Sequence, residues 1–128
     1  MLDHIGLTVA DFVRARAFYT AALAPLSLAV MMEVTAAETG GPAYAGFGAD
    51  RKPFFWIYGG PRASGPLHVA FAAASRAEVD AFYRAAMAAG ATDNGAPGLR
   101  PHYHPNYYGA FVLDPDGNNI EAVCHRPE

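Results

Sequence analysis

Hydrophobic and polar positions alternate at the start of the chain. Ile5, Leu7 and Val9 are separated by small or polar residues, and His4 belongs to the polar set. An alternation with a period of two residues is typical of a strand that is buried on one face only. The pattern predicts a strand over residues 2–9, with the side chain of His4 on the face opposite the core.

The period then changes to that of a helix. Asp11 is a favourable N-cap, and apolar residues follow at helical spacing as far as Leu23. Pro25 ends the pattern, because proline cannot continue a helix. Segments rich in glycine and aromatic residues come next and predict three strands, at residues 28–34, 43–48 and 54–58. The order of elements is therefore β-α-β-β-β.

The same order recurs when residue i is compared with residue i+64. His4 falls on His68, and the triplet Ala-Phe-Tyr at 17–19 falls on the same triplet at 81–83. Alanine matches carry little weight in an alanine-rich chain, but the histidine and the triplet together indicate an internal duplication. We interpret the chain as a single domain of two βαβββ modules, at residues 1–63 and 64–128.

The second module shows its own helix and strand signals. Ser75 and Glu78 form a capping box, and Gly90 ends the helix that follows. Leu67, Val69 and Phe71 alternate with His68 and Ala70 in the strand before it, and further strands are predicted at residues 91–93, 107–113 and 118–125.

The alternation also predicts which way the polar residues point. Glu121 lies between Ile120 and Ala122, and a carboxylate among apolar neighbours is costly unless it is paired. If the apolar residues pack on the helices, then His4, His68 and Glu121 all face the opposite, concave side. The predicted fold class is α+β, a curved mixed sheet forming a cup into which two imidazoles and one carboxylate converge.

Composition and charge narrow the function. A chain of 128 residues with 52% hydrophobic residues suits one compact domain. The net charge of −3, without any block of like charges, argues against a nucleic-acid partner. We found no signal peptide or membrane-spanning segment and expect a cytoplasmic protein without a membrane partner. A single cysteine, Cys124, excludes an internal disulfide and a cysteine-rich zinc site.

A long loop precedes the last two predicted strands. It reads NGAPGLRPHYHPNYYG, at residues 94–109. Long loops in compact domains are often functional, and the alternative is an ordered surface lid of stacked aromatic residues. We predict that Arg100, His102 and Tyr108 contact substrate, and that His104 and Tyr107 handle protons.

The strands that carry His4, His68 and Glu121 read LDHIGLTV, PLHVAF and GAFVLDPDGNNIEAV. They resemble the vicinal oxygen chelate superfamily, which includes glyoxalase I, extradiol dioxygenases, fosfomycin-modifying enzymes and bleomycin-binding proteins. The resemblance covers nearly the whole chain. It implies that a divalent metal ion, one of Fe, Mn, Ni or Zn, is bound in the cup with His4, His68 and Glu121 as its ligands.

The chain departs from two patterns in that superfamily. Glyoxalase I draws a fourth ligand from the last strand of the first module, where this chain has Trp56 and Ile57, which do not bind metal. Three ligands leave coordination positions open for substrate or oxygen. His104 and the DPDG turn match the extradiol signature, but Phe111 stands where that signature has tyrosine.

Two functions follow from these observations. The first is a metal-dependent enzyme, of the lyase or dioxygenase type, that acts on a small molecule with adjacent oxygens. The second is a metal-free binding protein of the bleomycin-resistance kind, in which Trp56, with Phe55 and Tyr58, stacks on a planar ligand.

The resemblance also implies a homodimer, because short chains of this kind complete their cups by pairing. Two arrangements are open. The modules of one chain share a cup, or they swap, so that His4 of one chain joins His68 and Glu121 of the other.

Overall fold

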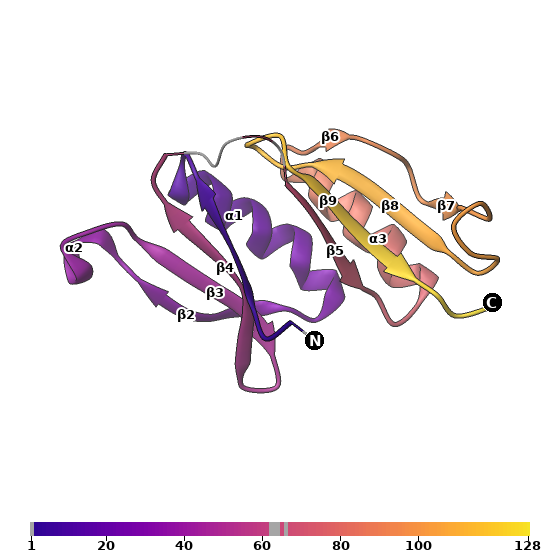
Figure 1. Cartoon of the computed structure of the whole chain (residues 1–128), viewed down its shortest axis with the longest axis horizontal. Helices are drawn as coiled ribbons and strands as arrows, with labels where there is room; N and C mark the ends of the chain where they lie inside the picture. Colours follow the sequence, from indigo (N-terminus) through magenta and orange to yellow (C-terminus); the bar gives the residue numbers. More distant parts are fainter. Residues whose placement is uncertain (1, 62–64, 66) are drawn as a thin grey trace.

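Two mixed sheets, one from each half of the chain, lie side by side in the computed structural model (Figure 1). The structure describes residues 2–61, 65 and 67–128. The N-terminal half contains β1 (Ile5–Val9), α1 (Phe12–Leu23), the 3-10 turn η1 (Ala24–Leu26), β2 (Ala29–Val34), α2 (Ala36–Thr39), β3 (Tyr44–Ala49) and β4 (Lys52–Gly59). The C-terminal half contains β5 (His68–Ala72), α3 (Arg76–Ala88), β6 (Thr92–Asp93), β7 (Gly98–Leu99), β8 (Tyr108–Leu113) and β9 (Asn119–Cys124).

The two sheets share the same pattern of strand order and pairing. The N-terminal sheet has the order β1-β4-β3-β2, and the C-terminal sheet has the order β5-β9-β8-β6, with β7 also paired to β8. In each sheet the first strand pairs parallel to the last strand of its half, and the other pairs are antiparallel. Among the described residues, β1 and β5 each have one unpaired edge.

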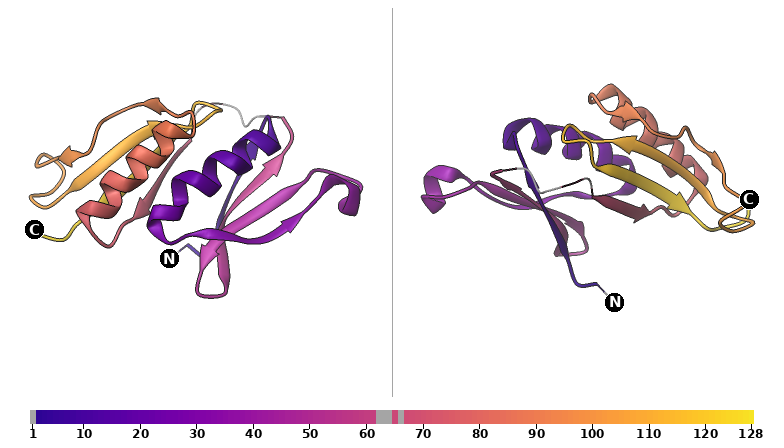
Figure 2. Two further views of the ribbon diagram at one scale, coloured as in Figure 1. Left: turned by 180° about the vertical axis from the view of Figure 1, so that it is seen from behind. Right: turned by 45° about the horizontal axis from the view of Figure 1, so that its top comes forward.

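Both long helices cover the same side of the sheets, as the view from behind shows (Figure 2). Asp11 caps α1 by accepting a hydrogen bond from the Arg14 amide at 3.1 Å, and Ser75 caps α3 by accepting one from Glu78 at 3.1 Å. Both caps are confirmed predictions. The helices stabilise the fold mainly through their buried faces, since isolated helices of this length are marginal in water.

One hydrophobic core joins the two halves. Val69 and Phe71 of β5 are buried, while the residues that alternate with them, His68, Ala70 and Ala72, are exposed, which confirms the predicted alternation. The Phe71 ring meets the Phe55 ring of β4 edge-on, with centroids 5.1 Å apart. Burial of such aromatic side chains on both sides of the junction is a main source of stability for the whole chain.

A buried carboxylate also links the halves. Asp114, in the turn between β8 and β9, accepts hydrogen bonds from Asn118 and, at 2.5 Å, from the hydroxyl of Tyr19 on α1. The sequence predicts only a turn at this segment. The structure adds a contact between residues 95 positions apart.

The predicted α+β fold class is confirmed, and the strands form two mixed sheets. Some elements begin or end at residues that differ from the prediction. β1 begins at Ile5, so His4 precedes the strand instead of lying in it. The short helix α2 and the two-residue strand β7 have no counterpart in the prediction, because single turns and two-residue pairings leave no periodic signal. Residues 62–64, and with them the predicted boundary between modules, lie outside the described residues. In the described part of the chain, we find no helix long and apolar enough to cross a membrane.

Candidate functional site

His68 and Glu121 meet on the open face of the C-terminal sheet. They lie on the adjacent parallel strands β5 and β9, where His68 is in register with Asn119. The imidazole Nε2 is 3.2 Å from the Glu121 Oε1 atom. Glu121 is 1% exposed, whereas His68 is exposed to solvent. The sequence prediction that these two side chains share a face therefore agrees with the structure.

The other nitrogen of His68 indicates its tautomer. Nδ1 lies 3.1 Å from the backbone carbonyl oxygen of Asn119. A carbonyl oxygen only accepts hydrogen bonds, so Nδ1 carries the hydrogen. In the neutral imidazole, the lone pair of Nε2 then faces the lone pairs of Glu121. Two acceptors that face each other at this distance require a proton or a metal ion between them.

The second oxygen of Glu121 is held by the loop. The Tyr107 hydroxyl donates a hydrogen bond to Glu121 Oε2. Burial raises the pKa of Tyr107, and the bond to the Glu121 carboxylate raises it further. The phenol therefore stays protonated at neutral pH and acts as a donor.

The remaining loop residues predicted to act on substrate do not touch this pair. Arg100 lies over the ring of Phe111, 5.4 Å from its centroid, and donates to the carbonyls of Gly98 and Ala96 at 2.8 Å. His102 is exposed and packs on Tyr103. These contacts order the loop across the open face.

The contacts of His104 are made within the loop and with His125. His104 Nδ1 accepts a hydrogen bond from the Asn106 amide at 3.1 Å, and its ring centroid is 5.6 Å from that of His125. His125 also lies edge-on to Tyr107, at 5.1 Å. His125, which follows β9, is therefore a packing neighbour of the loop.

Tyr108 lies on the opposite face of the sheet. Its hydroxyl donates to Asp80 of α3 at 2.7 Å, and it packs against the core. The substrate contact predicted for Tyr108 has no support at this position. The alternation along β8 could have predicted this position, because Tyr108 lies on the same face of the strand as Ala110 and Val112. Both of these residues are buried against the helices.

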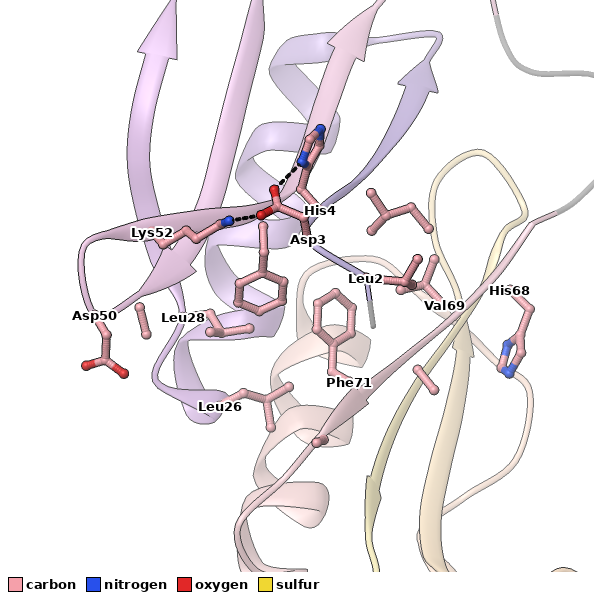
Figure 3. A pocket seen from close by; sticks show the side chains of 15 residues that line it. Leu2, Asp3, His4, Leu26, Leu28, Asp50, Lys52, His68, Val69 and Phe71 are labelled. Carbon is pink, nitrogen blue, oxygen red and sulfur yellow. Dashed lines mark hydrogen bonds and ion pairs between the residues drawn. The ribbon is translucent and has the colours of Figure 1, made fainter.

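His4 is separated from the pair within one chain. Its Nδ1 lies 2.6 Å from Asp3, and Asp3 also pairs with Lys52. The hydrogen bonds from Lys52 and His4 lower the pKa of Asp3. His4 and His68 lie on opposite sides of a cavity, with their rings pointing away from each other (Figure 3). Among the described residues of one chain, no three His, Cys, Asp or Glu side chains form a group able to hold a metal.

The cavity between the halves has a volume of about 930 Å³ and opens between β1 and β5. Its lining is mostly apolar and includes Leu26, Leu28, Phe54, Val69 and Phe71. The convergence of three ligands that the alternation predicts is therefore not completed within one chain, because the edges of β1 and β5 lie apart across this cavity.

The open face of the N-terminal sheet carries aromatic rings. Trp56 and Tyr58 of β4 are nearly parallel, at 23° with centroids 6.5 Å apart, and Tyr44 of β3 lies 6.0 Å from Trp56. We call Tyr44, Trp56 and Tyr58 the aromatic platform. A Cβ atom added at Gly46 would lie 2.8 Å from the Trp56 ring, so the glycine makes room for that ring to lie along the sheet.

The aromatic platform differs at two residues from the set of stacking residues that the sequence predicts. Phe55 is fully buried and points into the core, because it alternates with Trp56 along β4. Tyr44 takes part in its place, and the sequence analysis missed it. Its register with Tyr58 across β3 and β4 is set by tertiary pairing, which one strand's sequence does not reveal.

The fold and the His68–Glu121 pair define a class of small α+β proteins with two mixed sheets and a polar pair on an open sheet face. The chain belongs to the Glyoxalase/Bleomycin resistance protein/Dioxygenase superfamily, whose family model matches residues 1–122. A comparison with curated protein sequences found no match.

Solved structures with this fold are numerous. A glyoxalase/bleomycin resistance protein from Albidiferax ferrireducens is 28% identical, with a TM-score of 0.79 and 99% of both chains covered. A variant of glyoxalase I from Zea mays is 21% identical, with a TM-score of 0.71 over 95% of this chain and 46% of that one. A variant of the fosfomycin resistance protein FosX from Listeria monocytogenes is 18% identical, with a TM-score of 0.68 over 96% and 88%. The FosX structure is a complex with Mn(II) and 1S,2S-dihydroxypropylphosphonic acid.

Proposed function

We propose that the protein is a metal-dependent enzyme that acts on a small molecule with adjacent oxygens, with a divalent ion of Fe, Mn, Ni or Zn held by His4, His68 and Glu121. The observation that carries the proposal is the approach of His68 Nε2 to Glu121 Oε1 at 3.2 Å, with Nδ1 engaged by a backbone carbonyl. A metal-bound histidine commonly donates its second nitrogen to such an acceptor. The Mn(II) complex of FosX, which shares the fold, adds support.

The third ligand is proposed to come from a second copy of the chain. His68 and Glu121 supply two of the three proposed ligands, and we call this pair the half-site. His4 lies on the far side of the cavity in the same chain (Figure 3). In a homodimer whose halves swap, His4 of one chain joins His68 and Glu121 of its partner. The unpaired edges of β1 and β5 are available for such pairing in the described part of the chain. We further propose that the dimer is cytoplasmic.

The residues around the half-site would bind and orient substrate. When bound, the ion would supply Lewis-acid stabilisation of negative charge on a substrate oxygen. Two histidines and one carboxylate leave coordination positions open for that oxygen. The loop that carries Arg100, His102 and His104 covers the open face, and we propose that it excludes water and contributes to proton transfer. In the swapped dimer, Trp56, which lines a pocket with His4 on the N-terminal sheet, would offer an apolar surface to the rest of the substrate.

Thermal unfolding tests the metal directly. We expect Mn²⁺, Fe²⁺, Ni²⁺ or Zn²⁺ to stabilise the wild type, by about 2.7 kcal/mol when the free ion is at 100 times its Kd. EDTA should remove this gain. Glu121→Gln removes the anionic ligand, so its unfolding curve should be the same with metal and with EDTA. Metal analysis of protein purified without chelator is the supporting measurement.

A structural role for Glu121 gives a different result. If Glu121 only pairs with a protonated His68, Glu121→Gln breaks a charge pair in which the carboxylate alone is buried, and it lowers stability in EDTA as well as with metal. Wild-type curves that coincide with and without metal would end the metal proposal.

The aromatic platform favours a second candidate, a metal-free small-molecule binding protein of the bleomycin-resistance kind. Its rings lie on the open face of the N-terminal sheet. Trp56 lies on β4, and this strand supplies no fourth metal ligand in this chain. Metal-independent unfolding together with binding of planar ligands would support this candidate.

A further inference from the structure

We propose that Tyr107 is the positioning residue of Glu121 and that Gly109 provides the space in which Tyr107 reaches it. The inference rests on the proposed function, since it takes Glu121 as a metal ligand. It assigns Tyr107 to the orientation of the ligand and not to proton transfer with substrate.

The two oxygens of Glu121 have different partners. Oε1 lies 3.2 Å from His68 Nε2, and Oε2 accepts the hydrogen bond of the Tyr107 hydroxyl. The carboxylate is 1% exposed, so water does not compete freely for Oε2. A carboxylate held at one oxygen presents the other in a defined direction, which here is toward His68. Hydrogen bonds of this kind to ligating carboxylates tune metal affinity.

Tyr107 is itself held in place. Its amide donates to the carbonyl of His104 at 3.0 Å, and its carbonyl accepts from the Arg100 amide at 2.7 Å. Its ring packs edge-on against Tyr103 and His125, with centroids 5.0 and 5.1 Å away. The phenol therefore reaches Glu121 from a fixed position, and the cost of ordering it is met by contacts away from the site.

Gly109 supplies an independent indication that this contact is built into the fold. A Cβ atom added there would lie 3.1 Å from Tyr107 Cε1 and 3.3 Å from Glu121 Oε2. Gly109 is not among the residues with positive φ, so a side chain there would be opposed by close contacts and not by backbone conformation. A Cβ atom at this position would require the phenol or the carboxylate to move by a few tenths of an ångström.

The test measures metal affinity of the full chain by calorimetry with Mn²⁺ and Co²⁺. We expect Tyr107→Phe to weaken binding roughly 10- to 100-fold, the range for loss of an outer hydrogen bond to a metal ligand. Gly109→Ala should weaken binding in the same direction. The visible spectrum of the Co²⁺ protein should shift in Tyr107→Phe, because it reports the ligand geometry.

Tyr108→Phe is the matched control. It also removes a bond from a tyrosine to a carboxylate, but that carboxylate is Asp80, on the helix side of the sheet. We expect unchanged metal affinity for this variant. Unfolding in EDTA measures the purely structural cost of each substitution, and a structural role for Tyr107 would lower that midpoint while leaving metal affinity unchanged.

The outcomes separate the two proposals. If the wild type binds metal and Tyr107→Phe binds it equally well or more tightly, the positioning role is overturned and the metal site stands. If the wild type binds none of the ions, the metal site and the positioning role fall together. A loss of affinity in Tyr107→Phe and Gly109→Ala but not in Tyr108→Phe supports the positioning role.

Discussion

At the scale of single residues, two tyrosines at equivalent positions of the repeat have unequal roles. Tyr19 on α1 is fully buried and donates to Asp114 across the two halves, whereas Tyr83 on α3 donates to Asp93 at the surface. A hydrogen bond from a buried phenol to a carboxylate contributes more than the same bond in water. The tyrosines in the two copies of the Ala-Phe-Tyr triplet therefore contribute unequally to the stability of the fold.

We expect Tyr19→Phe to lower the free energy of unfolding by about 1.5–3 kcal/mol, because Asp114 loses a buried donor. Tyr83→Phe is the control and should have a much smaller effect, since solvent screens its bond. Urea unfolding of the two variants measures the difference. Equal losses would contradict the role of Asp114 as a link between halves.

The same residue predicts a response to alkaline pH. Burial raises the pKa of Tyr19 well above its ordinary value, and the negative charge of Asp114 adds to the effect. A raised pKa in the folded state means that the stabilisation is complete below the unfolded pKa of about 10 and is lost as pH rises above it. Tyr19→Phe should therefore lose less stability than the wild type above that pH.

At the scale of elements, the aromatic platform depends on β3 as much as on β4. Gly46 of β3 leaves room for the Trp56 ring, and a Cβ atom there would also lie 2.9 Å from Pro53. A side chain at this position has no space without movement of the ring. The platform is thus a property of two paired strands.

We expect 4-nitrocatechol, a planar ring with adjacent oxygens, to quench the fluorescence of Trp56, the single tryptophan, in the presence of EDTA. Gly46→Ala should displace the ring and weaken this binding roughly two- to tenfold, which corresponds to an aromatic pair energy of about 0.5–1.5 kcal/mol. Gly41→Ala is the control, because a Cβ atom there would lie 3.9 Å from its neighbour Thr39 Oγ1, an ordinary contact distance. Equal quenching in both variants would show that the aromatic platform does not contribute to ligand binding.

At the scale of the whole molecule, the position of His4 decides between a shared and a swapped cup. His4→Ala and Glu121→Gln homodimers should each bind metal poorly. When the two variants are unfolded together and refolded, a swapped heterodimer contains one intact site, with His4 from the Glu121→Gln chain and Glu121 from the His4→Ala chain. We expect metal binding at up to one ion per heterodimer.

Light scattering and calorimetry on the refolded mixture provide the measurement. A chain that forms its site alone would show no recovery, because every chain in the mixture carries a defect. A chain that remains monomeric at micromolar concentration would contradict the dimer itself.

Much of the fold and part of the site follow from local patterns. The period of two in β5 places His68 opposite Val69 and Phe71, and the side-chain caps at Asp11 and Ser75 start the two helices where the sequence predicts them. Glu121 likewise shares a face with His68. These features depend on neighbouring residues and on the geometry of a single strand or helix, so the sequence alone determines them.

Contacts between distant segments were decided only by the tertiary structure. Tyr107 reaches Glu121 because the loop folds back across the sheet, and Tyr19 reaches Asp114 because α1 packs against the turn between β8 and β9. His4 lies away from His68 because the edges of β1 and β5 face each other across the cavity. No periodicity encodes these distances, since they depend on how the two halves pack once their apolar faces share one core.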